Sequence, residues 1–103
     1  MTTSIEPTVL RGAVPVLERS SARIPILKRL IADCDRLAAD LDQEVRNEED
    51  RVRIHDPAHC AYPTYAKATA SRRDNLRRSA DGLRAHLAKA EQTLRELGEA
   101  LDA

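Results

Sequence analysis

Two histidines, an aspartate and a cysteine lie within one short segment in the middle of the chain, at His55, Asp56, His59 and Cys60. Imidazole, carboxylate and thiolate groups are all zinc ligands. A structural zinc ion, however, usually takes four ligands from two separated pairs, and Pro57 prevents the two histidines from sharing one helix face. We therefore interpret the segment as a turn in which Asp56 caps a local backbone donor. We expect no metal ion and no other cofactor.

The sequence offers no further candidate for a catalytic residue. General acid–base catalysis needs titratable groups in a concave, partly desolvated site, and the helical pattern described below predicts no such pocket. His86 is expected on the flank of a helix. The segment around Gly12 lacks both the spacing of a phosphate-binding loop and the Lys-Ser/Thr pair that follows it. The sequence thus predicts that the chain is not an enzyme.

Tyrosine and arginine side chains are the candidates for binding another protein. Tyr62 and Tyr65 are the only aromatic residues, and such amphipathic rings either form contacts with a partner or cover the end of the chain's own helices. Arginine binds carboxylates in bidentate geometry, so Arg72, Arg73 and Arg77 favour an acidic protein surface as partner. Nucleic acid is not expected, because the net charge is zero and further aromatic residues for base stacking are lacking.

The composition predicts the elements that position these residues. Ala, Leu, Arg, Glu and Lys make up about half of the 103 residues, which is typical of a long helix or a coiled coil. No segment shows the alternating pattern of a strand, and none has the roughly 18 apolar residues that cross a bilayer. We find no secretory signal in the sequence and expect a cytoplasmic protein. We predict an all-α fold.

Two helices are expected, over residues 26–55 and 64–101, and each carries an apolar stripe. In the first helix the stripe is predicted at Leu27, Leu30, Cys34, Leu37, Leu41, Val45 and Val52. In the second helix, steps of four and three form a heptad pattern, which keeps one stripe facing a neighbouring helix. Its members are Leu76, Ala80, Leu83, Leu87, Ala90, Leu94, Leu97 and Leu101.

An antiparallel two-helix coiled-coil hairpin satisfies both stripes. It places an acidic block, residues 40–50, opposite a basic block, residues 67–78, and Leu27 near Ala90 or Glu91. Residues 1–25 contain Pro7, Gly12, Pro15 and Pro25 and are predicted to be an irregular or partly helical arm. The second helix then extends beyond the first, so its last apolar side chains have no partner on the first helix. They must be covered by the arm, by a second copy of the chain or by another protein. These side chains are Leu94, Leu97 and Leu101.

Part of the sequence resembles a known family. The string DPAHCAYPTYAKA at residues 56–68, followed by RRDNL at residues 72–76, resembles the α-proteobacterial branch of the flagellar export protein FliJ family, and the similarity covers residues 26–97. Relatives usually open with a continuous helical segment that lengthens the first helix, whereas this chain has prolines there.

The resemblance implies an antiparallel coiled coil in the cytoplasmic part of the flagellar type III export apparatus. A member of the family is not a hydrolase. It acts as a stalk that contacts the export ATPase ring, the export gate or substrate chaperones, and it lies at the cytoplasmic face of the inner membrane without inserting. The alternative is a structural coiled-coil protein that self-assembles into a homodimer and has no export role.

Overall fold

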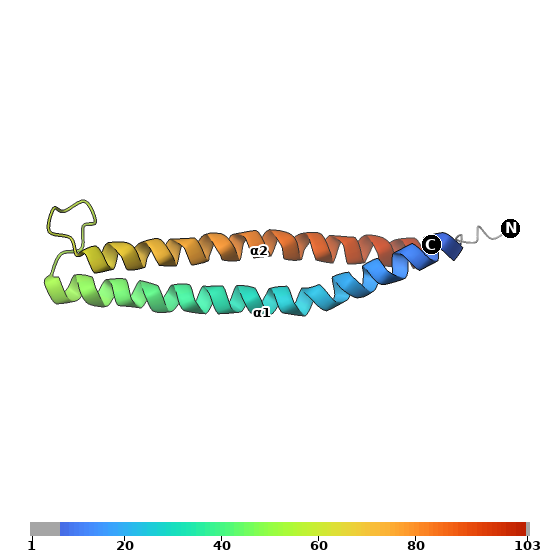
Figure 1. Ribbon diagram of the computed structural model, residues 1–103, viewed down its shortest axis with the longest axis horizontal. Helices are drawn as coiled ribbons and strands as arrows, with labels where there is room; N and C mark the ends of the chain where they lie inside the picture. Colours follow the sequence, from blue (N-terminus) through green and yellow to red (C-terminus); the bar gives the residue numbers. More distant parts are fainter. Residues whose placement is uncertain (1–6, 103) are drawn as a thin grey trace. The chain divides into compact units, whose positions relative to one another are not determined.

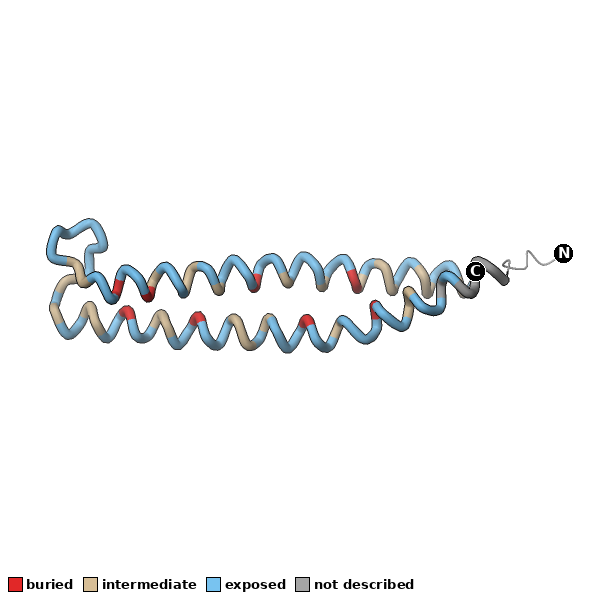
Figure 2. The backbone as a smooth tube through the Cα atoms, viewed as in Figure 1, coloured by how far each residue is buried: buried red, intermediate tan, exposed pale blue. Residues whose placement is uncertain are grey.

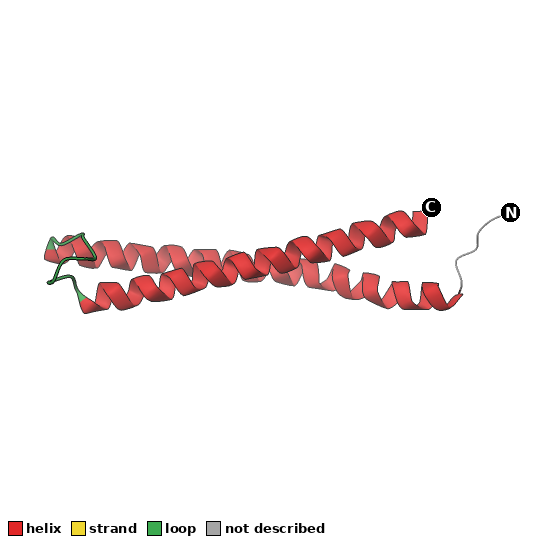
Figure 3. Cartoon of the chain, turned by 90° about the horizontal axis from the view of Figure 1, so that it is seen from above, coloured by secondary structure: helices red, strands yellow, loops and turns green. Residues whose placement is uncertain are grey.

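The chain forms an all-α helical hairpin. The computed structural model describes residues 7–102, with the side chains of residue 12 and of residues 14–102. Helix α1 covers Pro7–Val52 and helix α2 covers Thr64–Asp102, joined by a loop at residues 53–63, and no strand occurs among these residues (Figure 3). The predicted fold class is confirmed, and the second helix has nearly the predicted bounds. The first helix has different bounds at both ends.

Two compact units make up the hairpin, and each contains a part of both helices. One unit consists of the described residues up to Arg29 together with those from Arg84 onward. The other unit is the continuous segment Leu30–Leu83, which includes the loop. Within each unit, α1 and α2 lie side by side and run in opposite directions (Figure 1).

We expected an irregular or partly helical arm over residues 1–25. The chain is instead continuous helix from Pro7 onward. Residues 1–6 lie outside the described part of the chain. Helix α1 begins at Pro7 and includes both Pro15 and Pro25. A proline inside a helix removes one N–H donor and frees the carbonyl of the residue four positions earlier. At Pro25 that carbonyl belongs to Ser21, and both residues are exposed, so water can bind it. The helix is held instead by its inward side chains, such as Leu17 and Leu27.

The inward stripe of α1 differs from the predicted one. Leu30 and Leu37 are 44% and 46% exposed, so both lie outside the helix contact. The buried and half-buried positions instead follow steps of three and four without interruption, which is the coiled-coil spacing. Their members from Ser20 onward are Ser20, Ile24, Leu27, Ile31, Cys34, Ala38, Leu41, Val45, Glu48 and Val52. Five of the seven predicted members lie on this line, namely Leu27, Cys34, Leu41, Val45 and Val52, and the prediction is wrong only at Leu30 and Leu37.

The heptad stripe predicted for α2 is confirmed. Every predicted member from Leu76 to Leu101 is buried or half-buried, and Ala80 is fully buried. The stripe also extends toward the loop through Thr69 and Ala66, which are 1% and 0% exposed. Figure 2 shows the buried positions of each helix on the side that faces the other helix. Four of the buried residues are alanine, at Ala38, Ala66, Ala80 and Ala90.

Thr69 is buried without a partner for its hydroxyl. Its Oγ1 atom has no hydrogen bond to any described residue. An unsatisfied buried hydroxyl costs about 1–3 kcal/mol, and valine has nearly the same shape. We expect Thr69→Val to raise the free energy of unfolding by about 1–2 kcal/mol in urea denaturation. Thr93→Val, at a half-buried position, is the control, and an equal gain there would assign the effect to hydrophobicity alone.

A left-handed residue ends α1 at Val52, three residues before the predicted end at His55. Arg53 has a φ of 58°, and the N–H of Ile54 donates to the carbonyl of Glu49 over 3.2 Å. This bond, which spans six residues, belongs to the Schellman motif that closes many helices. Glycine usually occupies the left-handed position, because other L-residues are strained there.

Replacement of Arg53 tests this strain. Arg53→Gly is expected to raise the free energy of unfolding by about 1 kcal/mol, since glycine adopts a positive φ without steric cost. Arg53→Ala keeps the strained backbone and serves as control, with little change expected. Thermal melts followed by circular dichroism provide the comparison. A gain with alanine equal to that with glycine would mean that the arginine side chain, and not the backbone, is unfavourable.

Candidate functional site

The loop at the hairpin tip is a pair of consecutive turns held by local hydrogen bonds. The N–H of His59 donates to the carbonyl of Asp56, and the N–H of Tyr62 donates to the carbonyl of His59, both over 3.0 Å. The Asp56 carboxylate accepts from the N–H of Ala58 at 2.9 Å, which is the local capping role expected for it. His59 Nδ1 accepts from the N–H of Ala61 at 3.0 Å.

The residues considered as zinc ligands are engaged separately in this loop. His55 Nε2 lies 2.8 Å from the carboxylate of Asp50 on α1, while His59 bonds within its own turn. Cys60 is exposed. Within residues 7–102, no three His, Cys, Asp or Glu side chains are grouped as a metal ion would require.

The two tyrosines differ in how they meet α1. The Tyr62 hydroxyl donates to Glu49 at 2.8 Å, and the residue is half-buried. Burial, together with the negative charge of Glu49, raises the pKa of the Tyr62 phenol. The Tyr65 hydroxyl donates to Glu44 at 3.1 Å, but this residue is 54% exposed. Tyr62 therefore covers the end of its own helix pair, and Tyr65 presents most of its surface outward.

An ion-pair network centred on Asp42 joins the two helices behind the tip. Arg73 Nη1 of α2 lies 2.7 Å from Asp42 Oδ1, and each side chain is 20% exposed. Arg46 lies 3.0 Å from the same carboxylate and Arg77 lies 3.8 Å from it. The hydrogen bond from Arg73 holds the pKa of Asp42 below its usual value, with smaller contributions from the charges of Arg46 and Arg77. The hydrogen bonds that the Arg73 guanidinium donates to Asp74 and Asp42 raise the pKa of Arg73.

Loss of the Asp42 charge is expected to destabilise the hairpin in a pH-dependent way. At pH 7, Asp42→Asn should lower the free energy of unfolding by about 1–2 kcal/mol, because a hydrogen bond between charged groups is lost and Arg73 loses its partner across the helices. The folded pKa of Asp42 lies below the unfolded value of 3.8. The contribution of the Asp42 carboxylate to the free energy of unfolding is thus complete above the unfolded pKa and disappears as the pH falls through the folded pKa.

Urea denaturation at pH 7 and pH 3 provides the measurement. The difference between the parent chain and Asp42→Asn should shrink at the lower pH. Asp33→Asn is the matched control, because Asp33 makes only an exposed pair with Arg36 on the same helix, at 3.4 Å. Such pairs contribute less than about 0.5 kcal/mol. If Asp42→Asn lowered the free energy of unfolding equally at pH 7 and pH 3, stability would not depend on the protonation of Asp42, and the prediction would be wrong.

The acidic and basic blocks that were predicted to face each other meet at Asp42, which pairs with Arg73 and Arg77. Arg73 is 20% exposed and occupied by Asp42 across the helices, whereas Arg77 lies 3.8 Å from Asp42 and its side chain stays 54% exposed. Arg72 is exposed. Sequence reasoning missed the glutamates that accept from the two tyrosines, Glu44 and Glu49. The acidic block itself was the signal, because antiparallel packing brings it to the tyrosines as well as to the arginines.

The leucines near the end of α2 have a neighbouring helix. Leu94, Leu97 and Leu101 are half-buried, in the unit that also contains the beginning of α1. They were expected to extend beyond the first helix, but α1 begins at Pro7 rather than near residue 26. A partner is thus not required to cover them. Ala90 borders a hollow together with Ser20 and Arg23.

Comparisons with protein-family models, with curated proteins and with solved structures give no match for this chain. No helix in the described range is both long enough and apolar enough to cross a bilayer. Four exposed side chains remain as candidates for binding a partner. Tyr65 and Arg72 lie in the first part of α2, and Leu30 and Leu37 lie on α1.

Proposed function

We propose that the chain is a non-enzymatic component of the flagellar type III protein export apparatus. In this role it is a stalk in the cytoplasm, at the face of the inner membrane, that contacts the export ATPase ring, the export gate or substrate chaperones. The observation that carries the proposal is the position of the family-like string DPAHCAYPTY, which forms the loop from Asp56 onward and the first two residues of α2, Thr64 and Tyr65.

The length of α1 supports the same proposal. Family relatives open with a continuous helix, and the prolines in this chain predicted a departure from that pattern. Helix α1 nevertheless begins at Pro7 and continues through Pro15 and Pro25. The apparent departure is therefore one of sequence and not of secondary structure.

Tyr65 and Arg72 are the proposed contact residues. The Tyr65 ring is 54% exposed, which suits it for burial against a partner. Arg72 lies two turns further along α2 and is exposed, and its guanidinium suits a carboxylate on a protein surface. Arg73 and Tyr62, in contrast, serve the packing of the hairpin.

A motility assay with a binding assay tests this role. Deletion of the gene should abolish spreading in soft agar, and the parent sequence should restore it. The double variant Tyr65→Ser with Arg72→Glu should restore it poorly and should bind less of the purified export ATPase, gate domain or chaperone. Arg95→Glu, at an exposed position far along α2, is the control and should behave as the parent. Full motility of the deletion strain would overturn the proposal.

Self-association is the second candidate, and one observation favours it. Leu30 and Leu37 lie on one side of α1, two turns apart, and both are more than 40% exposed. Burial of such side chains against a second copy is favourable. Light scattering decides between the two roles: a stable dimer that dissociates on Leu37→Asp supports the self-assembling alternative, whereas a monomer that co-elutes with the export ATPase supports the stalk.

A further inference from the structure

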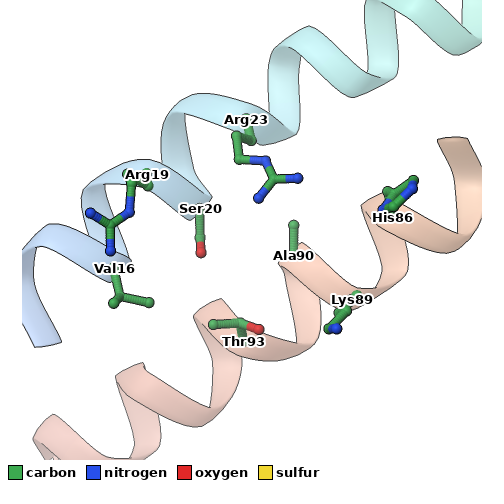
Figure 4. A pocket seen from close by; sticks show the side chains of 8 residues that line it. All are labelled: Val16, Arg19, Ser20, Arg23, His86, Lys89, Ala90 and Thr93. Carbon is green, nitrogen blue, oxygen red and sulfur yellow. The ribbon is translucent and has the colours of Figure 1, made fainter.

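A hollow of about 400 Å³ lies between α1 and α2, entirely within the unit formed by the beginning of α1 and the end of α2. Four nitrogen-bearing side chains surround it. Arg19 and Arg23 come from α1, while His86 and Lys89 come from α2. Figure 4 shows Arg23 extending from α1 into the space toward Ala90 of α2.

Small residues at the helix contact create this space. Ser20 and Ala90 are each 8% exposed and occupy heptad positions where larger residues would fill the gap. Thr93 borders the same space, so two hydroxyl groups lie at the base of the hollow, one from each helix (Figure 4). Each hydroxyl can donate a hydrogen bond to a ligand.

The hollow carries positive charge without a carboxylate in its lining. Arg19 and Arg23 are four residues apart on α1, a spacing at which like charges destabilise a helix. No ion pair joins Arg19, Arg23 or Lys89 to another side chain in the described part of the chain. The hollow near the tip differs, since Asp42 and Glu49 line it together with its basic residues. A bound anion would supply the missing charge.

The donors indicate which kind of anion would bind. Two guanidinium groups, an ammonium group, an imidazole and two hydroxyls can all donate hydrogen bonds, and only an anion with many acceptor oxygens can use them together. Phosphoryl groups meet this requirement, and arginine binds them in bidentate geometry. The lining contains no Tyr, Phe or Trp on which a nucleobase could stack. The volume lies within the range of small-ligand pockets.

We propose that this hollow is a binding site for the phosphate chain of a small anion that carries two or more phosphoryl groups. Arg19 and Arg23 hold the chain from α1, Lys89 and His86 hold it from α2, and Ser20 and Thr93 donate to it from the base. The inference is independent of the export role, because it depends only on the chemistry of this unit.

Calorimetric titration of the full chain with inorganic tripolyphosphate at low ionic strength tests the site. Arg23→Gln and Lys89→Gln should each weaken binding about tenfold, and the double variant about a hundredfold, because each removes a charged hydrogen bond. Arg29→Gln is the control, since Arg29 is exposed on the same helix but does not line the hollow. It should change binding less than twofold. Circular dichroism verifies that each variant remains helical.

Titrations with two other anions, adenosine triphosphate and hexaglutamate, show which kind of anion the hollow binds. Titration with adenosine triphosphate separates the sources of the phosphate chain: binding as tight as that of tripolyphosphate identifies a nucleotide tail, and weaker binding identifies free polyphosphate. The proposal is overturned if tripolyphosphate does not bind at millimolar concentration, or if Arg29→Gln weakens binding as much as Arg23→Gln does. It is equally overturned if hexaglutamate binds as tightly, because the site would then be one for an acidic protein segment.

Discussion

Leu27→Ala is expected to lower the free energy of unfolding by about 2–3 kcal/mol, whereas Leu37→Ala should lower it by less than about 1 kcal/mol. The two substitutions remove the same atoms from the same helix. Leu27 is 8% exposed and packs on the helix contact, so its truncation leaves a cavity. Leu37 is 46% exposed and loses little burial. Urea denaturation followed by circular dichroism measures both.

This pair of variants also tests which residues of α1 face α2. If α1 packed through the stripe that follows its leucines, Leu37→Ala would cost as much as Leu27→Ala. A similar loss in the two variants would therefore contradict the heptad line that passes through Ala38. Leu30→Ala provides a replicate at the second exposed leucine, which is 44% exposed, and should match Leu37→Ala.

Pro25→Ala is expected to raise the free energy of unfolding by about 2–3 kcal/mol. A proline in a helix interior costs about 3 kcal/mol relative to alanine, because it lacks the N–H donor and its ring crowds the preceding turn. Pro25 lies well inside α1 and is exposed, so alanine restores the bond to Ser21 without loss of packing. Thermal and urea melts should both show the gain.

Pro57→Ala is the control for this prediction. Pro57 is exposed in the loop at residues 53–63, outside both helices, so replacement there should leave stability unchanged or slightly lower, through greater freedom of the unfolded chain. A gain of similar size at Pro57 would mean that the improvement comes from loss of proline in general. An unchanged stability in Pro25→Ala would mean that α1 does not continue as helix through this position.

The fold was predictable because its strongest signals are local and periodic. The heptad in α2 runs without interruption from Leu76 to Leu101 and needs only one neighbouring helix to satisfy it. The beginning of α1 could not be predicted in this way, because Pro15 and Pro25 are strong local signals against helix. Packing of Leu17 and Leu27 against α2 outweighs them, and such long-range contacts are not visible in local propensities.

The candidate sites were only partly predictable for a related reason. Arginine and tyrosine were recognised by type, but their availability depends on register. Arg73 is occupied by Asp42 only because the antiparallel packing brings the two side chains within 2.7 Å. The basic hollow was not predicted, because Arg19, Ser20 and Arg23 lie in the region expected to be an irregular or partly helical arm, and not part of a long helix packed on α2.

The many alanines along the contact have a thermodynamic consequence. Ala38, Ala66, Ala80 and Ala90 each contribute one methyl group to the interior. Unfolding therefore hydrates little new apolar surface, and the accompanying increase in heat capacity is small for a chain of this length. A small heat-capacity change gives a flat dependence of stability on temperature, so cooling and moderate warming alter the folded population gradually.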